Sequence, residues 1–200
     1  LHLPLIKPST HSNQMANNSR DDERFSSSNP FDWTTPKSDF ESSNFRTEYK
    51  AFSKDNVNAK TVRDCLPYDI KQKYDEFASS LKVEEKCVKI WTLSSIIYPT
   101  LTQALYTDNQ HQIKQYVPLI RGINKFLVTP TKREITTYRG SHMSDKQFSV
   151  YKAGNIYRAP SFAATSENQS VANNFKNKYS LKFRIPKGCW NAAPISHLSV

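Results

Sequence analysis

The chain has 200 residues, of which 37% are hydrophobic and 12% aromatic, and its formal net charge is +10. This length allows one ordinary domain with a tail, and the aromatic content argues against a chain that is disordered throughout. No apolar run approaches the roughly 20 residues that a membrane-spanning helix needs, so we expect no membrane span. The first residue is Leu1 rather than Met, which suggests a fragment or a processed product.

The positive charge is unevenly distributed along the chain. Residues 1–50 contain six Lys or Arg and seven Asp or Glu, so residues 51–200 carry the whole excess. A basic folded part favours an anionic partner, such as a nucleotide, a nucleic acid or a phospholipid. The alternative is a basic soluble domain with no anionic partner, because charge governs association rather than chemistry.

Cysteine and histidine give no sign of a metal or redox site. Cys65, Cys87 and Cys189 match no zinc or redox spacing, and their odd number allows at most one disulfide within the chain. Neither His142 nor His197 has a second residue at metal-ligand spacing. We therefore expect no metal, and the three cysteines favour a reducing compartment such as the cytoplasm.

Two regions differ in their apolar patterning. Residues 1–50 are rich in Ser, Asn, Thr and acidic residues and show neither helical nor strand periodicity. Such a segment cannot bury enough apolar surface to offset its ordering entropy, so it is predicted to be a disordered tail or linker. Residues 56–200 are predicted to form the folded domain.

Helices come first in this domain. Apolar residues at helical spacing predict one helix over residues 69–81 and another over 84–98, which Pro99 should end or kink. A further helix is predicted over 110–127, with Pro130 closing it.

Strands follow the helices. A β-rich run predicts a strand over 134–139 that stops at Gly140, and strict alternation predicts a half-buried strand over 179–185. The remaining expected elements are a short strand over 161–165, a helical turn over 168–176, a turn at 186–188 and a strand that opens at 193. Helices followed by strands predict an α+β fold.

Two short clusters could carry chemistry. Arg139 is expected at a strand end beside Gly140, where a planar guanidinium suits phosphate oxygens and the glycine lets a ligand approach the backbone. The alternative for Arg139 is a surface turn. Hydroxyl residues in 161–168 could bind a sugar or orient a carboxylate, whereas the alternative is a helix cap formed by Ser166 or Asn168.

Four short motifs occur in a fixed order in the second half of the chain: Tyr138-Arg139-Gly140, Phe162-Ala163-Ala164-Thr165-Ser166, Ala172-Asn173-Asn174-Phe175 and Leu181-Lys182-Phe183-Arg184-Ile185. With the helical segments upstream, this series resembles the NAD–protein-arginine mono-ADP-ribosyltransferases of the arginine–serine–glutamate class. The resemblance covers roughly residues 65–200. It implies an ADP-ribosyltransferase fold, in which an N-terminal helical lobe packs on two facing, mostly antiparallel β-sheets.

The resemblance also implies roles for individual residues. Arg139, followed by Gly140, would grip the NAD phosphates. Thr165 and Ser166 would belong to the family's Ser-Thr-Ser strand beneath the nicotinamide ribose, so that NAD lies between Arg139 and Ser166. Phe175 would lie near the nicotinamide. Ser199 would be the family serine shortly before the Glu-x-Glu turn. The implied partners are NAD, as substrate, and an acceptor protein modified on arginine.

Two departures from the family pattern bear on activity. Ala164 replaces the first serine of the Ser-Thr-Ser strand, and no Asp or Glu follows Glu167. Because the reaction needs a carboxylate to stabilise an oxocarbenium-like state, we expect the Glu-x-Glu motif to lie beyond Val200 and these 200 residues alone to be inactive. The alternative is a catalytically inactive NAD- or nucleotide-binding module. A nucleic-acid-binding domain is not expected, because no nucleic-acid-binding motif is recognised.

Overall fold

The computed structural model describes residues 57–93, 96–106, 109–127, 129–141, 145, 161–175, 178–189 and 192–198. These residues form both helices and strands, as expected for an α+β protein. The chain divides into two units: one runs as far as Val128 and takes up Pro194–Val200, and the other contains Thr129–Ala193. We call them the helical unit and the sheet unit. The expected tail over residues 1–50 lies outside the described residues.

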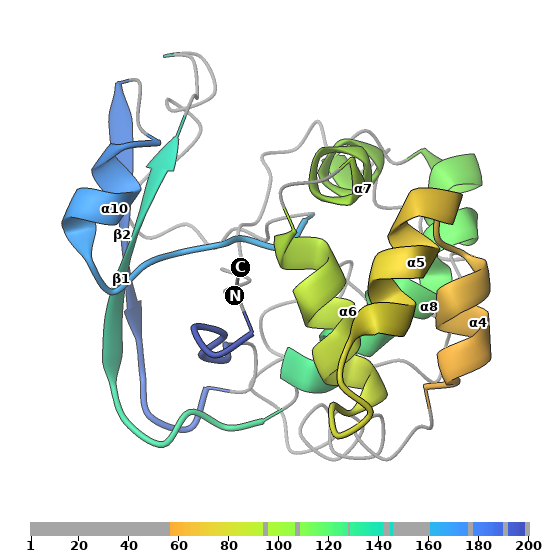
Figure 1. Cartoon of the computed structure of the whole chain (residues 1–200). Coiled ribbons are helices and arrows are strands. Elements are labelled where there is room, and N and C mark those ends of the chain that lie inside the picture. The colour runs from red at the N-terminus through yellow and green to blue at the C-terminus, as the bar shows by residue number, and fades with distance from the viewer. Residues whose placement is uncertain are drawn as a thin grey trace, which may run out of the picture. The chain divides into compact units, whose positions relative to one another are not determined.

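The helical unit is built from α-helices that follow one another closely in sequence (Figure 1). They are α4 (Ala59–Asp64), α5 (Tyr68–Glu76), α6 (Val83–Thr92), α7 (Ile97–Tyr106) and α8 (Gln110–Leu127). Each contributes apolar side chains to the core of the unit, among them Val62, Ile70, Trp91, Leu101 and Ile120. This burial is what stabilises such short helices, because isolated helices of this length are marginal in water.

Helix α8 confirms the helix expected over 110–127. Its start is marked by Asn109, whose side-chain oxygen accepts a 3.2 Å hydrogen bond from the Gln112 amide. Buried Ile113, Ile120 and Ile123 lie on its apolar stripe. Pro118 lies inside the helix, where it removes one backbone donor.

The other helices differ in extent from the expectation. Helix α5 ends at Glu76, because Phe77 has an extended ψ of 138°, so the predicted continuation to residue 81 is wrong. Pro99 neither ends nor kinks α6: that helix ends at Thr92, and Pro99 lies in the first turn of α7, where a missing N–H costs nothing. Helix α4 was not expected; Asn58 caps it by accepting from the amides of Lys60 and Thr61.

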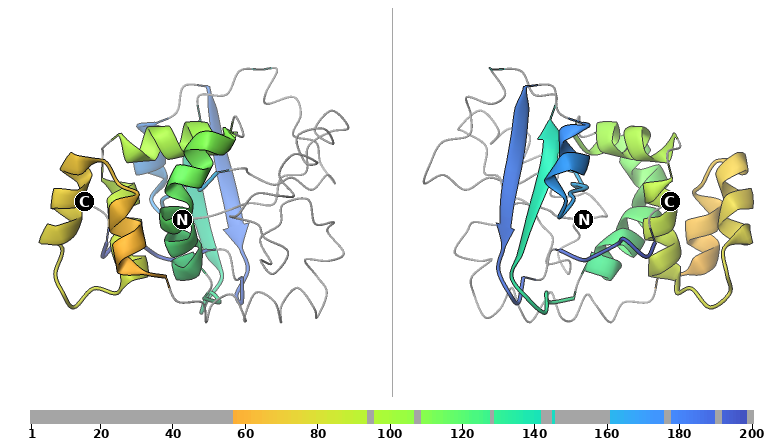
Figure 2. Two further views of the ribbon diagram at one scale, coloured as in Figure 1. Left: turned by 90° about the vertical axis from the view of Figure 1, so that its right-hand side faces the viewer. Right: turned by 60° about the vertical axis from the view of Figure 1, so that its left-hand side comes forward.

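In the sheet unit, β1 (Ile135–Ser141) pairs antiparallel with β2 (Tyr179–Ile185). The two strands lie side by side in both views of Figure 2. Burial alternates along β2 as the sequence predicts, and β1 continues one residue past Gly140. The short helix α10 (Gln169–Asn173) packs against β1. The expected strand over 161–165 is wrong: only Ala163 forms an isolated bridge there, and Ser166, just past this range, forms an antiparallel bridge with Tyr138.

Past β2, the chain turns twice. Cys189 N donates a 3.2 Å hydrogen bond to Pro186 O, and Gly188 has a φ of 81°, a conformation that favours glycine. The turn expected at 186–188 is therefore confirmed. The strand expected from residue 193 is wrong as far as residue 198: Leu198 N bonds to Ile195 O at 2.8 Å and closes a turn.

Candidate functional site at Arg139

The strand register gives the β1–β2 sheet two chemically different faces. Residues that pair directly across antiparallel strands share a face, and alternate residues along a strand point to opposite faces. The inner face carries Arg139 and Thr137 opposite Leu181 and Phe183. The outer face carries Thr136 and Tyr138 opposite Arg184 and Lys182. On β2 the outer-face residues are exposed, whereas the inner-face residues are half-buried or buried.

Arg139 is a half-buried cation on a largely apolar face. Its Nη1 donates a 2.8 Å hydrogen bond to the carbonyl oxygen of Ala164. Within the described residues, no carboxylate lies within ion-pair distance of its guanidinium. A guanidinium has five N–H donors in a planar fork, so this side chain retains donors that suit an anion with several oxygens.

The acidic residues of the sheet unit are engaged elsewhere. Glu134 pairs with Arg184 at 2.9 Å, Glu167 with Arg133 at 2.9 Å, and Asp145 with Lys178 at 2.7 Å. Hydrogen bonds from Lys178 and from the Tyr179 hydroxyl lower the pKa of Asp145. Each of these carboxylates therefore has a basic partner other than Arg139.

The bridge at Ser166 decides where the neighbouring hydroxyls lie. Tyr138 and Ser166 exchange backbone hydrogen bonds of 2.7 and 2.9 Å. Because Ser166 is directly opposite Tyr138, its side chain belongs to the outer face, and alternation places Thr165 on the inner face with Arg139. The register thus brings Arg139 and Thr165 to one face and Ser166 to the other.

Ser166 and Asn168 also make the local contacts of a helix start. The Ser166 hydroxyl accepts a 3.0 Å hydrogen bond from the Asn168 amide, and the Asn168 side chain accepts a 2.9 Å bond from the Ser170 amide. Asn168 is the N-cap of α10, which confirms the cap interpretation for this residue. Since the Ser166 oxygen already accepts from a backbone donor, its own O–H proton remains to be donated.

The other expected site residues are dispersed. Gly140 lies within β1 opposite Ser180, so Arg139 is two residues from the strand end. Phe175 follows α10 and is 64% exposed. Ser199 and His142 lie outside the described residues.

Thr137 and Ser161 of the sheet unit have buried hydroxyls, and of these two residues only Ser161 lies in a segment that the sequence analysis singled out for its hydroxyls. Thr137 is 6% exposed, and among the described residues its hydroxyl has no hydrogen-bond partner. Ser161 is 2% exposed, and its hydroxyl likewise has no hydrogen-bond partner among the described residues. No sequence pattern marks the burial of such residues, because Thr in a strand and Ser before an apolar run are both common.

Three findings concern the wider molecule. Across the described part of the chain, no group of three or more His, Cys, Asp or Glu residues is arranged to hold a metal ion. None of its helices is long and apolar enough to cross a membrane. Comparisons with protein-family models, with curated proteins and with solved structures find no match to this chain.

Proposed function

We propose that the chain binds NAD through Arg139 and forms most of a domain that transfers ADP-ribose from NAD to a protein side chain, arginine, with release of nicotinamide. The observation that carries this proposal is the state of Arg139: a half-buried guanidinium with one hydrogen bond, to Ala164, and no carboxylate partner in the described residues. Such a group is stabilised by a diphosphate, whose oxygens match its fork of donors.

Further residues are assigned by position around Arg139. Thr165 shares its face by alternation, and Gly140 follows it in β1. Ser166 bridges to Tyr138, the residue before Arg139, and keeps a hydroxyl proton that can be donated. In this proposal Thr165 contacts the ribose, and Phe175 and Ser199 complete the nicotinamide end. Ser166, whose side chain belongs to the outer face, supports the site through its backbone bridge to Tyr138. The fold proposed is that of an ADP-ribosyltransferase, with the helical unit as its helical lobe.

Transfer needs more than binding. The bond to nicotinamide breaks through an oxocarbenium-like state, which a carboxylate must stabilise. Glu134, Asp145 and Glu167 are each paired with a basic residue, so the proposal assigns the catalytic role to a Glu-x-Glu motif encoded after Val200. The same pairing, together with Ala164 in place of serine, favours a second candidate: a catalytically inactive NAD-binding module.

Calorimetric titration of NAD into wild-type protein, Arg139→Ala and Arg139→Lys tests the binding step. Charge-assisted hydrogen bonds contribute roughly 1.5–3 kcal/mol, so Arg139→Ala should weaken NAD binding by about tenfold to a hundredfold. Arg139→Lys should restore little, because an ammonium lacks the planar fork. It can still donate to Ala164 O, so it controls for the structural bond that Arg139 makes.

A matched control is Arg133→Ala, which removes an exposed arginine of the same unit that pairs with Glu167. This variant should bind NAD like the wild type, and thermal melting should show that all the variants fold. Equal NAD affinity in wild-type protein and folded Arg139→Ala would reject the site. The coding sequence beyond Val200 separates the two candidates, since Glu-x-Glu shortly after that residue is required by the transferase and not by the binding module.

A further inference from the structure

Positive charge is concentrated in the sheet unit. Between Thr129 and Ala193 the sequence contains eleven Lys or Arg and only three Asp or Glu, which is +8 of the chain's net +10. The other residues of the chain are close to electrical balance. A basic excess of this size on one unit is the electrostatic pattern of a protein that binds a polyanion.

Local ion pairs compensate only part of this charge. All three acidic residues of the unit pair with basic residues, namely Arg184, Arg133 and Lys178. Lys132, Lys182 and Lys187 are exposed, and in the part of the chain that the structure describes none of them has a carboxylate partner. The ion pair of Arg184 is also exposed, with 76% of the arginine side chain accessible, so that pair is weak and can be exchanged for a phosphate.

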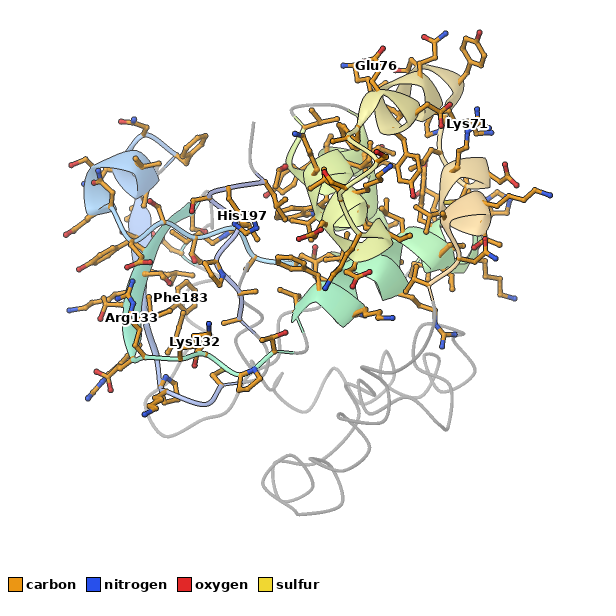
Figure 3. All side chains as sticks on the ribbon, turned by 60° about the horizontal axis from the view of Figure 1, so that its bottom comes forward. Lys71, Glu76, Lys132, Arg133, Phe183 and His197 are labelled. Atoms are coloured by element: carbon orange, nitrogen blue, oxygen red, sulfur yellow. The ribbon has the colours of Figure 1, made fainter. Side chains whose placement is uncertain are left out.

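The fold arranges several of these cations along one path. Lys182 and Arg184 are alternate residues of β2 and lie on its exposed outer face, about 7 Å apart along the strand. Lys187 follows in the turn that β2 enters. Thr131 is bonded to Gly188 and Cys189 of that turn, which brings the backbone at Lys132 next to the turn that contains Lys187. Figure 3 shows Lys132 and Arg133 on the segment that leads into β1.

An aromatic side chain lies next to these cations on the outer face. Tyr138 is half-buried and is the direct cross-strand partner of Lys182 on the outer face. The next outer-face residue along β1 is Gly140, which has no side chain to cover the Tyr138 ring. Cations beside a ring on an exposed sheet face are the combination that binds single strands: the phosphates lie on basic residues, and a nucleobase stacks on the ring.

A duplex fits this surface less well. A two-stranded ribbon can enter the major groove only if it protrudes, whereas β1 is bridged on its second edge by Ser166 and is packed by α10. With neighbours on β1, the two strands do not form a free ribbon. A basic surface with a ring suits a flexible single strand, which can follow the surface and unstack its bases.

We propose that the outer face of the β1–β2 sheet binds single-stranded nucleic acid, with phosphates on Lys182, Arg184 and Lys187 and a base stacked on Tyr138. The inner face with Arg139 is not involved, so this proposal does not depend on NAD binding. It differs from the expectation drawn from sequence motifs, because the strand register and the ion pairs reveal a surface that no motif encodes.

Fluorescence anisotropy with a labelled oligothymidylate of roughly 12 nucleotides tests the proposal across a range of salt concentrations. The slope of log K against log salt changes by about 0.7 for each phosphate of a single strand that the protein ceases to neutralise. The double variant Lys182→Gln/Lys187→Gln should therefore flatten the slope by about 1.4. Lys73→Gln/Lys114→Gln removes the same charge from exposed residues of the helical unit and should leave the slope unchanged.

A stacking readout separates a nucleic acid from other polyanions. Tyr138→Leu should weaken oligothymidylate binding by roughly fivefold to a hundredfold with an unchanged salt slope, and should not alter binding to heparin. Ultraviolet cross-linking of the wild-type protein to a 4-thiothymidine strand should map to the peptide containing Tyr138, and it needs no variant.

Five results would overturn the proposal, four from binding and one from cross-linking. The first is an equal change of the salt slope in the two double variants, and the second is tighter binding of a duplex than of a single strand. The third is an equal effect of Tyr138→Leu on the binding of heparin and of the oligonucleotide. The fourth is binding of phosphatidylserine vesicles in preference to the oligonucleotide. Cross-links that map only outside the Tyr138 peptide would have the same consequence.

Discussion

Thr131 connects the segment before β1 to the turn after β2. Its hydroxyl donates a 2.7 Å hydrogen bond to Pro186 O and accepts a 3.0 Å bond from the Cys189 amide. Its own backbone bonds to Gly188 N and Cys189 O. The residue is 7% exposed, so these groups are bonded to one another rather than to water, and one side chain closes the end of the sheet.

We predict that Thr131→Val destabilises the protein by about 1–3 kcal/mol. Valine keeps the shape but removes two hydrogen bonds, the one to the Pro186 carbonyl and the one from the Cys189 amide, each worth roughly 0.5–1.5 kcal/mol. Urea denaturation measures the loss. Thr136→Val is the matched control, because Thr136 is half-buried in β1 and its side chain faces the outer side; an equal loss in both variants would contradict the role of the Thr131 hydroxyl.

Sequence reasoning at the residue scale found Arg139 but not its surroundings. The strand and the glycine beside it are visible as a local pattern. Its bond to Ala164 joins residues 25 positions apart, and the face on which Ser166 lies depends on the bridge to Tyr138. Such non-local pairings decide what a side chain meets, and no local pattern contains them.

Helices α6 and α8 approach each other closely at one point. A Cβ placed on Gly122 would overlap Sγ of Cys87 and lie 3.0 Å from its Cβ. Cys87 is fully buried, so neither atom can move into solvent. The absence of a side chain at residue 122 is therefore a condition for the packing of these two helices.

We predict that Gly122→Ala destabilises the helical unit by about 1–3 kcal/mol, the usual cost of overpacking. This sign is opposite to that expected for an exposed helix position, where the same change adds roughly 0.5–1 kcal/mol of stability. Denaturation of Gly122→Ala, Cys87→Ala and the double variant forms a cycle. The double variant should recover much of the loss, and simple additivity would show that the two residues do not compete for space.

Elements with an uninterrupted apolar periodicity could be predicted from the sequence, whereas the turns after α5 and near Leu198 could not. Helix α8 and strand β2 carry apolar stripes along their whole length, and both match the expected bounds. Phe77 continues the stripe of α5 in sequence yet has an extended backbone, because the chain turns there toward α6. Residues 193–198 were expected to open a strand, but they close a turn at Leu198.

The molecule as a whole combines a basic sheet unit with a helical unit that buries titratable groups. Burial raises the pKa of Cys65 from 9.0 to about 11 and that of Tyr74 from 10.0 to about 12. The Cys65 thiol also donates to Val62 O at 3.0 Å. Both groups are thus held in their neutral forms, and the folded state retains these protons at a pH where the unfolded chain has released them.

Stability should therefore fall at alkaline pH. When folding raises the pKa of a group, stability is unaffected at any pH below the pKa of that group in the unfolded chain, which is near 9 for Cys65. Stability then falls as the pH rises from that value toward the pKa in the folded protein. Between about pH 8 and pH 10 the Cys65 contribution to this loss is roughly 1 kcal/mol. Urea denaturation at both pH values should show a smaller loss in Cys65→Ala than in wild-type protein. Equal losses would mean that Cys65 does not titrate in this range.

The bond from Arg139 to Ala164 also selects a direction of approach. A guanidinium can bind two oxygens at once either end-on, through Nη1 and Nη2, or side-on, through Nε and Nη2. Nη1 donates one of its two N–H groups to the Ala164 carbonyl, so the side-on edge is the one that this bond leaves wholly untouched. In the proposed complex, a phosphate taken by this edge would be held through two of its non-bridging oxygens.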